Sequence, residues 1–495
     1  MATRLLLNVI CSLLILGCHA PEWHAVRTVK GNHSIVRVTA TGQAYDFHRP
    51  WLKRQPVTHR AVAPILSGNR VLVTAEVIAD ATYIEIEKAE SGAKTPATVE
   101  WVDYEANLAL LKSDDAGFFS DLTPLSLAAP AATNDEIDIW QLESNDTLAA
   151  TKGYINTVEV GRYTDDATRL LLYRLNLSLQ IREGGSVLPA LSHSRLAGLL
   201  FRYDARTQNA TVIPSEVIER FLKEAGNGQA SSFPQTGFSY STLRDPQLRR
   251  YAGAENESGG VYLTRIGPES PAAKAGLESG DVLLAVDGTP VDMDGHYQCP
   301  PYGKVGVENW VASRYAVGDK LKVKILRKGK PMEFVLQLDR KKPEKFVCPP
   351  YLYDRAPGYY VLGGLVFLEL SRPYLREWGE NWATTAPQKL VYQDAYQDEL
   401  FGAEKRRLVI LSQVLAAPSN IGYDRLHTLI VTKINGKEIR RLSDIDPALE
   451  QSGPEFCTVE FEEDPRIIYL DIPRLRLEEP QLQKLYRLNE LKRIP

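Results

Sequence analysis

Short apolar or alternating runs separated by turn residues fill residues 57–213, and this pattern constrains the fold of the chain more than any other feature. Examples are NRVLVTAEVI, TYIEIEKA, ATVEWVD, NLALLK and RLLLYRLNLSL. Runs of this length and spacing are typical of the strands of an all-β barrel or sandwich. The region closes with VIPSEVIERFLKEAGNG, where Pro214 and Ser215 open a short amphipathic helix that the glycines end. A polar linker, NGQASSFPQTG, follows.

Two further segments share one order of predicted elements. Residues 233–338 contain a strand, the short helix PAAKAGL, a strand ending at the Asp-Gly turn 287–288, a helix at GVENWVASRY and two strands. Residues 357–472 echo this order, and the Asn-Gly turn at 435–436 matches the Asp-Gly turn. We therefore expect an internal repeat of one domain type.

The N-terminal residues predict a targeting segment. A basic start, MATR, precedes LLLNVICSLLILG, an apolar run too short to span a bilayer as a mature helix. The run ends in Leu-Gly-Cys at 16–18, which is similar to the bacterial lipobox, so Cys18 would carry lipid and anchor the mature protein in the bacterial cell envelope. The alternative is an ordinary cleaved signal peptide with Cys18 incidental, which gives a periplasmic protein. No later segment is long enough to cross a membrane.

The composition and the cysteine content bear on the partners, the cofactors and the redox state of the chain. The chain has 495 residues, is 44% hydrophobic and 24% charged, and has a net charge of −4. These values suit a soluble protein of several domains and give no indication of a nucleic-acid partner, and we expect neither cofactor nor metal. Cys299 and Cys348 both lie in Cys-Pro-Pro-Tyr, so an oxidising compartment would permit a disulfide between them, although two unrelated loop cysteines fit equally. Cys457 is typical of a small buried core residue.

Three segments carry a resemblance to a known family: GFSYSTLRDPQLRRYAG, GVYLTRIGPESPAAKAGLESGDVLLAVDG and APGYYVLGGLVFLELSRPYL. They resemble the HtrA/Deg family, most of all its plant-type members, whose second PDZ domain is divergent. The resemblance covers nearly the whole mature chain. It implies a mostly β fold with α+β modules, in which a chymotrypsin-like double β-barrel is followed by two PDZ-like domains.

The pattern and the resemblance together give six segments. They are a signal peptide with lipobox at 1–18, an N-terminal tail at 19–45, a trypsin-like (pseudo)protease domain at 46–225, a first PDZ domain at 233–338, a second PDZ-like domain at 346–472 and a helical tail at 473–495. In the tail, four apolar side chains share one side of a predicted helix, which is typical of a face that docks onto the protein: Leu482, Leu485, Tyr486 and Leu488.

The catalytic motifs that the resemblance implies are altered in all three places. GNRVLVTAEVIADA aligns with the histidine motif, and Glu76 stands where the family has its general base. Asn107 begins Asn-Leu-Ala-Leu-Leu, where the family has aspartate. In GGSVLP, Ser186 keeps the nucleophile position and Gly184 keeps an oxyanion-hole position, but valine and leucine replace the two glycines that follow the serine.

These changes remove the chemistry that activates a serine. A serine hydroxyl becomes nucleophilic only when a neighbouring base takes its proton, and imidazole suits because its two nitrogens face serine and aspartate at once. A glutamate is ionised and far less basic at neutral pH, and Asn107 cannot stabilise an imidazolium. Among the remaining histidines, we expect His193 to face solvent, and His59 is the one outside candidate for a base. Removing single triad members costs several orders of magnitude in rate, so we expect negligible turnover and regard Ser186 as a relic.

If the barrel is inert, the PDZ domains carry the function. PDZ domains add the C-terminal strand of a peptide to a sheet edge and hold its carboxylate on backbone N–H groups. In the second domain, the alternative to a peptide-binding segment is a turn followed by a buried strand with no binding role. The candidate peptide-binding residues are Gly260, Val261, Tyr262 and Leu263 in the first domain and Gly364, Leu365, Val366 and Phe367 in the second.

The leading hypothesis is a catalytically inactive, HtrA-like envelope lipoprotein that binds protein C-termini or unfolded polypeptides as a scaffold, adaptor or holdase. One alternative is a serine endopeptidase of periplasmic quality control that uses Ser186 with an atypical base. Another is a structural subunit of a Deg-type assembly. The resemblance also allows a homotrimer or a higher oligomer.

Overall fold

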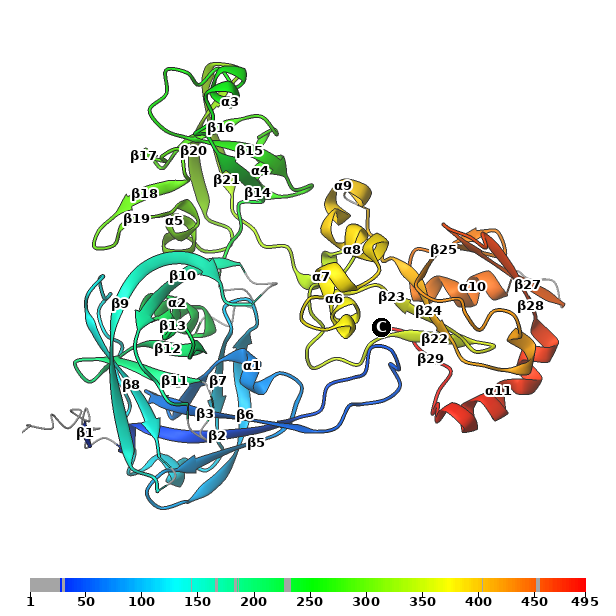
Figure 1. The fold of residues 1–495 in the computed structure, drawn as a ribbon, viewed down its shortest axis with the longest axis horizontal. Helices are drawn as coiled ribbons and strands as arrows, with labels where there is room; N and C mark the ends of the chain where they lie inside the picture. The colour runs from blue at the N-terminus through cyan, green and yellow to red at the C-terminus, as the bar shows by residue number, and fades with distance from the viewer. Residues whose placement is uncertain are drawn as a thin grey trace, which may run out of the picture.

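The fold was analysed in a computed structural model that describes residues 27–28, 32–143, 145–164, 168–181, 185, 187–226, 233–402, 404–450 and 455–495. Three of the predicted site residues, Cys18, Gly184 and Ser186, lie outside the described residues. Figure 1 shows two β-barrels, a third unit above them and a fourth unit to the right that contains the C-terminus. The fold is mostly β, as predicted.

The first barrel is closed and lies at the N-terminal end of the chain (Figure 1). Its strands pair in the order β2-β3-β4-β7-β6-β5. They span β2 (Ile35–Gly42), β3 (Val57–Leu66), β4 (Arg70–Val73), β5 (Ala81–Lys88), β6 (Lys94–Asp103) and β7 (Leu108–Lys112). A single-turn helix, α1 (Ala75–Ile78), links β4 to β5 and buries Val77 and Ile78 against the barrel core.

The second barrel also closes, because β8 pairs with both β9 and β11. Its strands are β8 (Glu136–Leu142), β9 (Leu148–Arg162), β10 (Arg169–Asn176), β11 (Leu188–Ser192), β12 (Arg195–Asp204) and β13 (Asn209–Pro214), with the short β1 (Arg27–Thr28) alongside β9. The helix expected after Pro214 is α2 (Ser215–Gly226), and its apolar side, with Val217, Ile218 and Phe221, is buried. The predicted double barrel is therefore confirmed.

The third unit is a sheet with the strand order β14-β15-β16-β20-β21. The strands are β14 (Phe238–Thr242), β15 (Val261–Ile266), β16 (Val282–Val286), β20 (Lys320–Arg327) and β21 (Lys330–Gln337), with the short β17 (Thr289–Pro290) beside β16. The helices are α3 (Pro246–Tyr251), α4 (Pro271–Ala275) and α5 (Val307–Arg314). Asp287 and Gly288 both have positive φ, which is the conformation of the predicted tight turn.

The fourth unit repeats this architecture and adds to it. Its sheet runs β28-β27-β25-β24-β23-β22-β29, with β26 beside β25. The strands are β22 (Tyr359–Leu362), β23 (Leu365–Glu369), β24 (Val409–Val414), β25 (Leu429–Ile434), β26 (Lys437–Glu438), β27 (Phe456–Phe461), β28 (Ile467–Asp471) and β29 (Lys492–Arg493). The helices are α6 (Arg372–Leu375), α7 (Trp382–Thr385), α8 (Gln388–Ala395), α9 (Gln397–Phe401), α10 (Ile445–Leu449) and α11 (Ile472–Tyr486).

The predicted repeat is visible in the order of the elements. Strands β14, β15, β16, β20 and β21 correspond to β23, β24, β25, β27 and β28, and the turn at Asn435 and Gly436 again has positive φ at both residues. The C-terminal segment differs from the prediction of a separate tail. Helix α11 starts at Ile472, and β29 pairs with β22, so the segment belongs to the fourth unit. Leu482 and Leu488 are buried as expected, but Leu485 is exposed.

A hairpin inserted in the third unit fixes it to the second barrel. β18 (His296–Cys299) and β19 (Gly303–Gly306) form this hairpin, and Tyr297, Cys299 and Val305 are buried in the core of the second barrel. The hydroxyl of Tyr302 also donates to the Glu216 carboxylate at the start of α2. The third unit is therefore anchored to the barrel rather than tethered by the linker alone.

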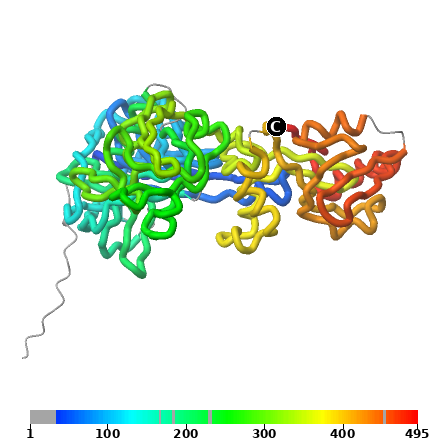
Figure 2. Tube along the Cα trace, turned by 90° about the horizontal axis from the view of Figure 1, so that it is seen from above, coloured from blue at the N-terminus to red at the C-terminus, as the bar shows by residue number. Residues whose placement is uncertain are grey.

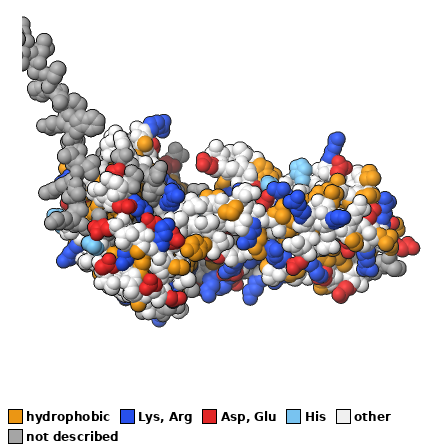
Figure 3. All heavy atoms as spheres, turned by 90° about the horizontal axis from the view of Figure 1, so that it is seen from below, with side chains coloured by type: hydrophobic (Ala, Val, Ile, Leu, Met, Phe, Trp, Pro, Cys, Tyr) orange, Lys and Arg blue, Asp and Glu red, His pale blue; other side chains and the backbone are white. Residues whose placement is uncertain are grey.

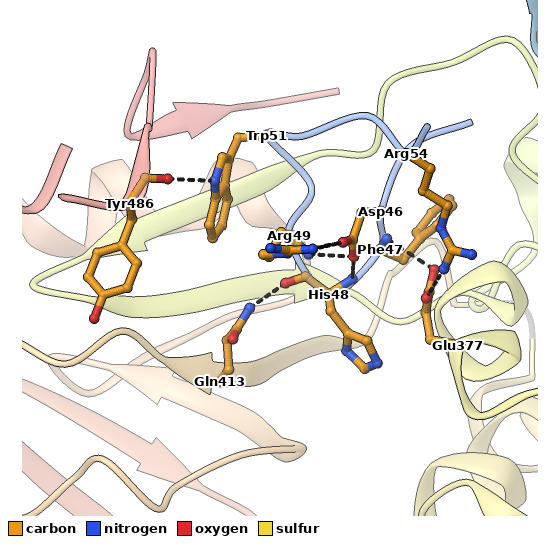
Figure 4. Close-up of polar contacts among 9 residues, drawn as sticks. All are labelled: Asp46, Phe47, His48, Arg49, Trp51, Arg54, Glu377, Gln413 and Tyr486. Atoms are coloured by element: carbon orange, nitrogen blue, oxygen red, sulfur yellow. Dashed lines mark hydrogen bonds and ion pairs between the residues drawn. The ribbon is translucent and has the colours of Figure 1, made fainter. Parts of the chain in front are cut away.

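The loop between β2 and β3, residues 43–56, reaches across from the first barrel to the fourth unit; we call it the strap (Figures 1 and 2). Figure 4 shows its contacts. The indole Nε1–H of Trp51 donates to the Tyr486 carbonyl at 3.1 Å, and the Phe47 N–H donates to Glu377 Oε1 at 3.1 Å. Arg54 also pairs with Glu377, and Trp51 is buried in the core of the fourth unit. The strap therefore joins the barrels to the C-terminal half of the chain.

Two further contacts join the first barrel to the segment that precedes the fourth unit. The guanidinium of Arg340 is buried, and its nitrogens lie 2.8 Å from Glu105 Oε1 and 3.5 Å from Asp103 Oδ2. Asp80 and Asp354 exchange backbone N–H to carboxylate hydrogen bonds of 2.9 and 2.8 Å. The buried charges of Arg340, Asp103 and Glu105 are paired only when the barrel and the linker are in contact.

Cys299 and Cys348 are free, buried thiols in different hydrophobic cores, and Cys457 is a buried core thiol as predicted. Within the described part of the chain, none of the helices combines the length and the apolar character needed to span a bilayer. On the face drawn in Figure 3, hydrophobic side chains are scattered among basic and acidic ones.

Candidate functional site: a barrel junction without histidine and an open sheet edge

The structure brings Glu76 and Asn107 into contact. Asn107 comes directly before β7, is fully buried and has a left-handed φ of 51°. Its Oδ1 accepts a hydrogen bond of 3.0 Å from the backbone N–H of Glu76, the second residue of α1. The Glu76 side chain itself is exposed. The contact between the two chain segments therefore persists with an amide oxygen in place of a carboxylate oxygen.

The same corner holds two buried polar atoms without a partner. Nδ2 of Asn107 and Oγ1 of Thr74, the residue before α1, have no hydrogen-bond partner among the described residues. An unpaired buried donor costs about 1–3 kcal/mol, so it is more often found at functional sites or at sites derived from them than in ordinary cores. A carboxylate at position 107 would carry no N–H and would not leave this donor unpaired.

The nucleophile segment runs alongside β3 at the junction of the two barrels. Val187 forms a parallel bridge with Ala61, and the Val62 N–H donates to the Val187 carbonyl at 3.1 Å. Gly185 has a φ of 94°, and a Cβ there would lie 1.7 Å from the Arg60 carbonyl oxygen, so only glycine fits. Gly185 and Val187 are the sequence neighbours of Ser186, which itself lies outside the described residues.

The two residues that replace glycines are used for packing. Val187 is 5% exposed and belongs to the core of the first barrel, whereas Leu188 is 2% exposed and belongs to that of the second. Their side chains therefore fill the junction on the C-terminal side of the serine.

Neither candidate histidine is buried near the Glu76–Asn107 corner. His193 is exposed at the β11–β12 turn, as expected, and its Nδ1 lies 3.1 Å from the neighbouring Ser192 hydroxyl. His59 is exposed on β3, where it pairs across the sheet with Ala40. Among the described residues, no histidine contacts Glu76 or Asn107 through a hydrogen bond or an ion pair.

The first PDZ-like unit has an open edge, but not where the sequence placed it. Val261, Tyr262 and Leu263 lie on β15, which pairs with β14 on one side and with β16 on the other. Gly260, directly before this strand, is buried. These four residues cannot accept an added strand, and the expected position is corrected to β14, which stands at the end of the sheet with no further strand among the described residues.

A cavity of about 1000 Å³ lies along this edge. Phe238, Ser239 and Tyr240 of β14 line it. Helix α5 contributes Val307, Glu308, Val311 and Ala312 to the lining. The hydroxyl of Tyr240 donates to Glu308 Oε1 at 3.1 Å and so joins β14 to α5. Burial, and then the Glu308 charge, raise the pKa of the Tyr240 hydroxyl. Within the described residues, the backbone N–H groups of Thr236 and Gly237, just before β14, have no acceptor.

The corresponding edge in the second PDZ-like unit is already occupied. Gly363 and Gly364 form a tight turn, and Leu365 begins β23, which pairs with β22 as well as with β24. The four predicted peptide-binding residues Gly364, Leu365, Val366 and Phe367 are all buried. The prediction that they accept a peptide strand is corrected, because the chain's own β22 lies where a peptide would add.

Comparisons with known proteins bear on the whole chain. A PDZ-domain sequence profile matches residues 348–491, and another matches residues 262–299. The Arabidopsis thaliana protein named "Protease Do-like 4, mitochondrial" is 26% identical over 488 residues, which cover 96% of this chain and 89% of the relative. "Putative protease Do-like 3, mitochondrial", from the same organism, is 27% identical and covers 89% of this chain and 76% of the relative.

The chain is similar to proteins of the HtrA/Deg family along nearly its whole length. Among solved structures, the one titled "HtrA-type protease AlgW with decapeptide" is 18% identical, with a TM-score of 0.48, and the match covers 63% of this chain and 97% of that one. The chain combines a serine protease-like pair of barrels with two PDZ domains, of which the first has the open edge.

One cluster of potential metal ligands occurs among the described residues of this HtrA/Deg-like chain: Asp292, Asp294 and His296. Lys304 Nζ lies 2.9 Å from Asp292, and Arg244 pairs with Asp294. Protein cations therefore already neutralise both carboxylates.

Sequence reasoning missed two features. The β14 edge begins in GFSYSTL, one of the segments that carries the family resemblance, but its position at the sheet end depends on pairing. The strap was missed because it has no periodicity, although Phe47 and Trp51 are conspicuous aromatic residues in a polar loop.

Proposed function

We propose that this HtrA/Deg-like chain is a peptide-binding protein whose barrels do not cleave. The observation that carries the proposal is the Asn107–Glu76 contact, in which an amide oxygen binds a backbone N–H and the side chain at position 76 is an exposed carboxylate. A general base must accept the serine proton and pass it to the leaving group, and the described residues at this corner include no imidazole for either step.

The first PDZ domain is the proposed recognition site. A peptide that adds to β14 would complete the backbone hydrogen bonds of the edge strand, and its side chains would meet the apolar face of α5. The N–H groups of Thr236 and Gly237 are suitably placed at the start of β14 to hold a terminal carboxylate. The clients proposed are protein C-termini and unfolded polypeptides, with the protein as a scaffold, adaptor or holdase.

Binding can be tested on the full chain by blocking the groove chemically. Ser239→Cys introduces an exposed thiol on β14 inside the cavity, whereas Thr242→Cys introduces one on the same strand outside the cavity lining. The described native thiols are buried, so a bulky maleimide should prefer the new cysteine. We expect labelled Ser239→Cys to lose binding of C-terminal library peptides at least about tenfold, with labelled Thr242→Cys unchanged. Equal binding by both labelled proteins would refute this site.

Proteolysis is tested separately with casein. We expect wild type and Ser186→Ala to cleave it at the same background rate. Cleavage that depends on Ser186 would instead support the alternative of an endopeptidase with an atypical base. If neither peptides nor casein engage the chain, the remaining proposal is a structural subunit of a Deg-type assembly.

For location, we propose that residues 1–18 are a secretory signal with Cys18 as the lipidation site in a bacterial envelope. The support is the largely apolar run LLLNVICSLLI before Leu-Gly-Cys, which differs from the amphipathic, arginine-rich pattern of an organellar transit peptide. The Arabidopsis relatives carry mitochondrial names, so organellar import is the alternative. Mass spectrometry of the mature N-terminus decides between a lipidated Cys18 and any other start.

A further inference from the structure

The cavity at the β14 edge extends beyond the first PDZ domain. It is also lined by Arg162 and Thr168 of the second barrel, by Lys345 in the linker after β21, and by Lys405 and Arg441 of the second PDZ domain. A peptide whose end lies on β14 would therefore have its preceding residues in a cleft bounded by three parts of the molecule. The side chains that line this outer part of the cleft belong to elements other than β14.

The lining of the cleft has an excess of positive charge. Eleven lysine and arginine residues line it, against seven aspartate and glutamate residues. The whole chain, by contrast, has a net charge of −4. The excess is therefore local, and a cleft lined by one sign of charge concentrates ligands of the opposite sign.

Nearly all of the acidic groups in the lining are already paired. Lys341 lies 2.8 Å from Asp398, and Arg169 lies 3.2 Å from Glu308. Arg407 lies 3.4 Å from Glu369. Similar pairs involve Asp339, Glu344 and Glu404, which leaves Glu269 as the one lining carboxylate with no ion pair among the described residues.

Several cations of the lining, in contrast, form no ion pair within the described part of the chain. Arg162, Lys345, Lys405 and Arg441 are exposed, and none of them pairs with a carboxylate of the described residues. They come from the end of β9, the short 3-10 turn Pro343–Lys345 and two loops of the second PDZ domain. Because these positive side chains belong to three parts of the molecule, they can contact a bound chain at more than one point.

We propose that the cleft selects peptides that carry acidic residues upstream of an apolar C-terminal end. The proposal rests on the proposed function of the first PDZ domain, because the groove between β14 and α5 binds the end of the peptide and the cations of the cleft bind its upstream carboxylates. A peptide is favoured over a nucleic acid because the cations adjoin an unpaired strand edge and an apolar helix face. The apolar lining comes from Val311 of α5, Val286 of β16 and Leu321 of β20.

The test measures binding of two peptides to the full chain by fluorescence anisotropy. Both share the same apolar C-terminal end, and they differ only in carrying glutamates or glutamines upstream. We expect the glutamate peptide to bind about tenfold more tightly at 0.1 M salt and the difference to shrink at 1 M salt, where the Debye length falls from about 10 Å to about 3 Å.

The decisive variant is Lys345→Ala/Lys405→Ala, with Lys112→Ala/Lys484→Ala as the matched control. Lys112 and Lys484 are exposed and lie outside the cleft. The cleft variant should bind the glutamate peptide about fivefold more weakly and the glutamine peptide as wild type does, while the control leaves both unchanged.

Equal binding of the two peptides by wild type would overturn the acidic selectivity and leave the proposed peptide site intact. If neither peptide binds, and no member of a C-terminal peptide library binds either, both proposals are overturned. Binding of a single-stranded oligonucleotide that Lys345→Ala/Lys405→Ala abolishes, without any peptide selectivity, would assign the cleft to nucleic acid and likewise overturn the inference.

Discussion

Replacing Trp51 by alanine should release the strap from the second PDZ domain. The side chain is 8% exposed, packs against Tyr359 at a centroid distance of 5.9 Å and donates to the Tyr486 carbonyl. An aromatic side chain buries about 150–250 Å², which at about 25 cal/mol per Å² is worth about 4–6 kcal/mol as an upper estimate. Since truncating a buried Phe or Trp typically costs about 3–5 kcal/mol, we expect Trp51→Ala to weaken strap docking by at least 3 kcal/mol.

Limited trypsin digestion reads out this loss, because Lys53 and Arg54 lie in the strap itself. When opening is fast, cleavage follows the population of the open form, and 1.4 kcal/mol corresponds to a factor of ten. Trp51→Ala should therefore be cut after Lys53 or Arg54 about 100-fold faster than wild type, whereas Trp51→Phe, which loses mainly the hydrogen bond, should change the rate about fivefold.

Tyr251→Ala removes an exposed aromatic side chain and provides the control. The thermal midpoint of the barrels should stay constant across the series, so that the digestion reports local opening. A Trp51→Ala rate within twofold of wild type would show that the strap is held by something other than this side chain and would refute the reasoning.

Three further predictions concern stability. Gly185→Ala places a Cβ against the Arg60 carbonyl and should destabilise the barrel junction by about 3 kcal/mol in calorimetry. In the control Gly226→Ala the new Cβ meets open space and should not destabilise the chain. Equal melting midpoints of the two variants would contradict the packing argument. Burial raises the pKa of Asp292, but the Lys304 hydrogen bond and the His296 and Asp294 N–H groups outweigh it and lower the pKa to about 2. The stabilisation is therefore present above pH 3.8 and lost as the pH falls towards 2, and Asp292→Asn should remove that slope from acid titrations of the unfolding free energy. Burial, and to a lesser extent the charge of Asp354, raise the pKa of Asp80. Ionisation of Asp80 therefore lowers the stability of the fold as the pH rises through the folded-state pKa. Asp80→Asn should raise the unfolding free energy at pH 7 relative to wild type, and a loss of stability would contradict this assignment.

The sequence predicts elements whose signals are local. The strands of both barrels, the helix after Pro214 and the positive-φ turns at 287–288 and 435–436 follow from alternation, capping and turn chemistry. The motifs also single out Glu76 and Asn107, but the hydrogen bond between them is visible only in the structure.

What could not be predicted depends on long-range pairing. A Gly-apolar strand such as 260–263 has the same pattern whether it lies at the centre or at the edge of a sheet, and only the pairing with β14 decides which. The sequence around 363–367 likewise fits a peptide-binding loop, but β22 folds back on β23 and fills the position. The strap docks through single contacts such as Trp51 to Tyr486, which leave no periodic signal in the sequence.

Labelling with a fluorophosphonate probe tests the central claim most directly, since the probe reacts only with a serine whose hydroxyl is activated by a base. Intact-mass analysis of wild type and Ser186→Ala should show no adduct on either protein after prolonged incubation. A stoichiometric adduct on wild type that is absent from Ser186→Ala would contradict the account and establish this chain as an active serine hydrolase.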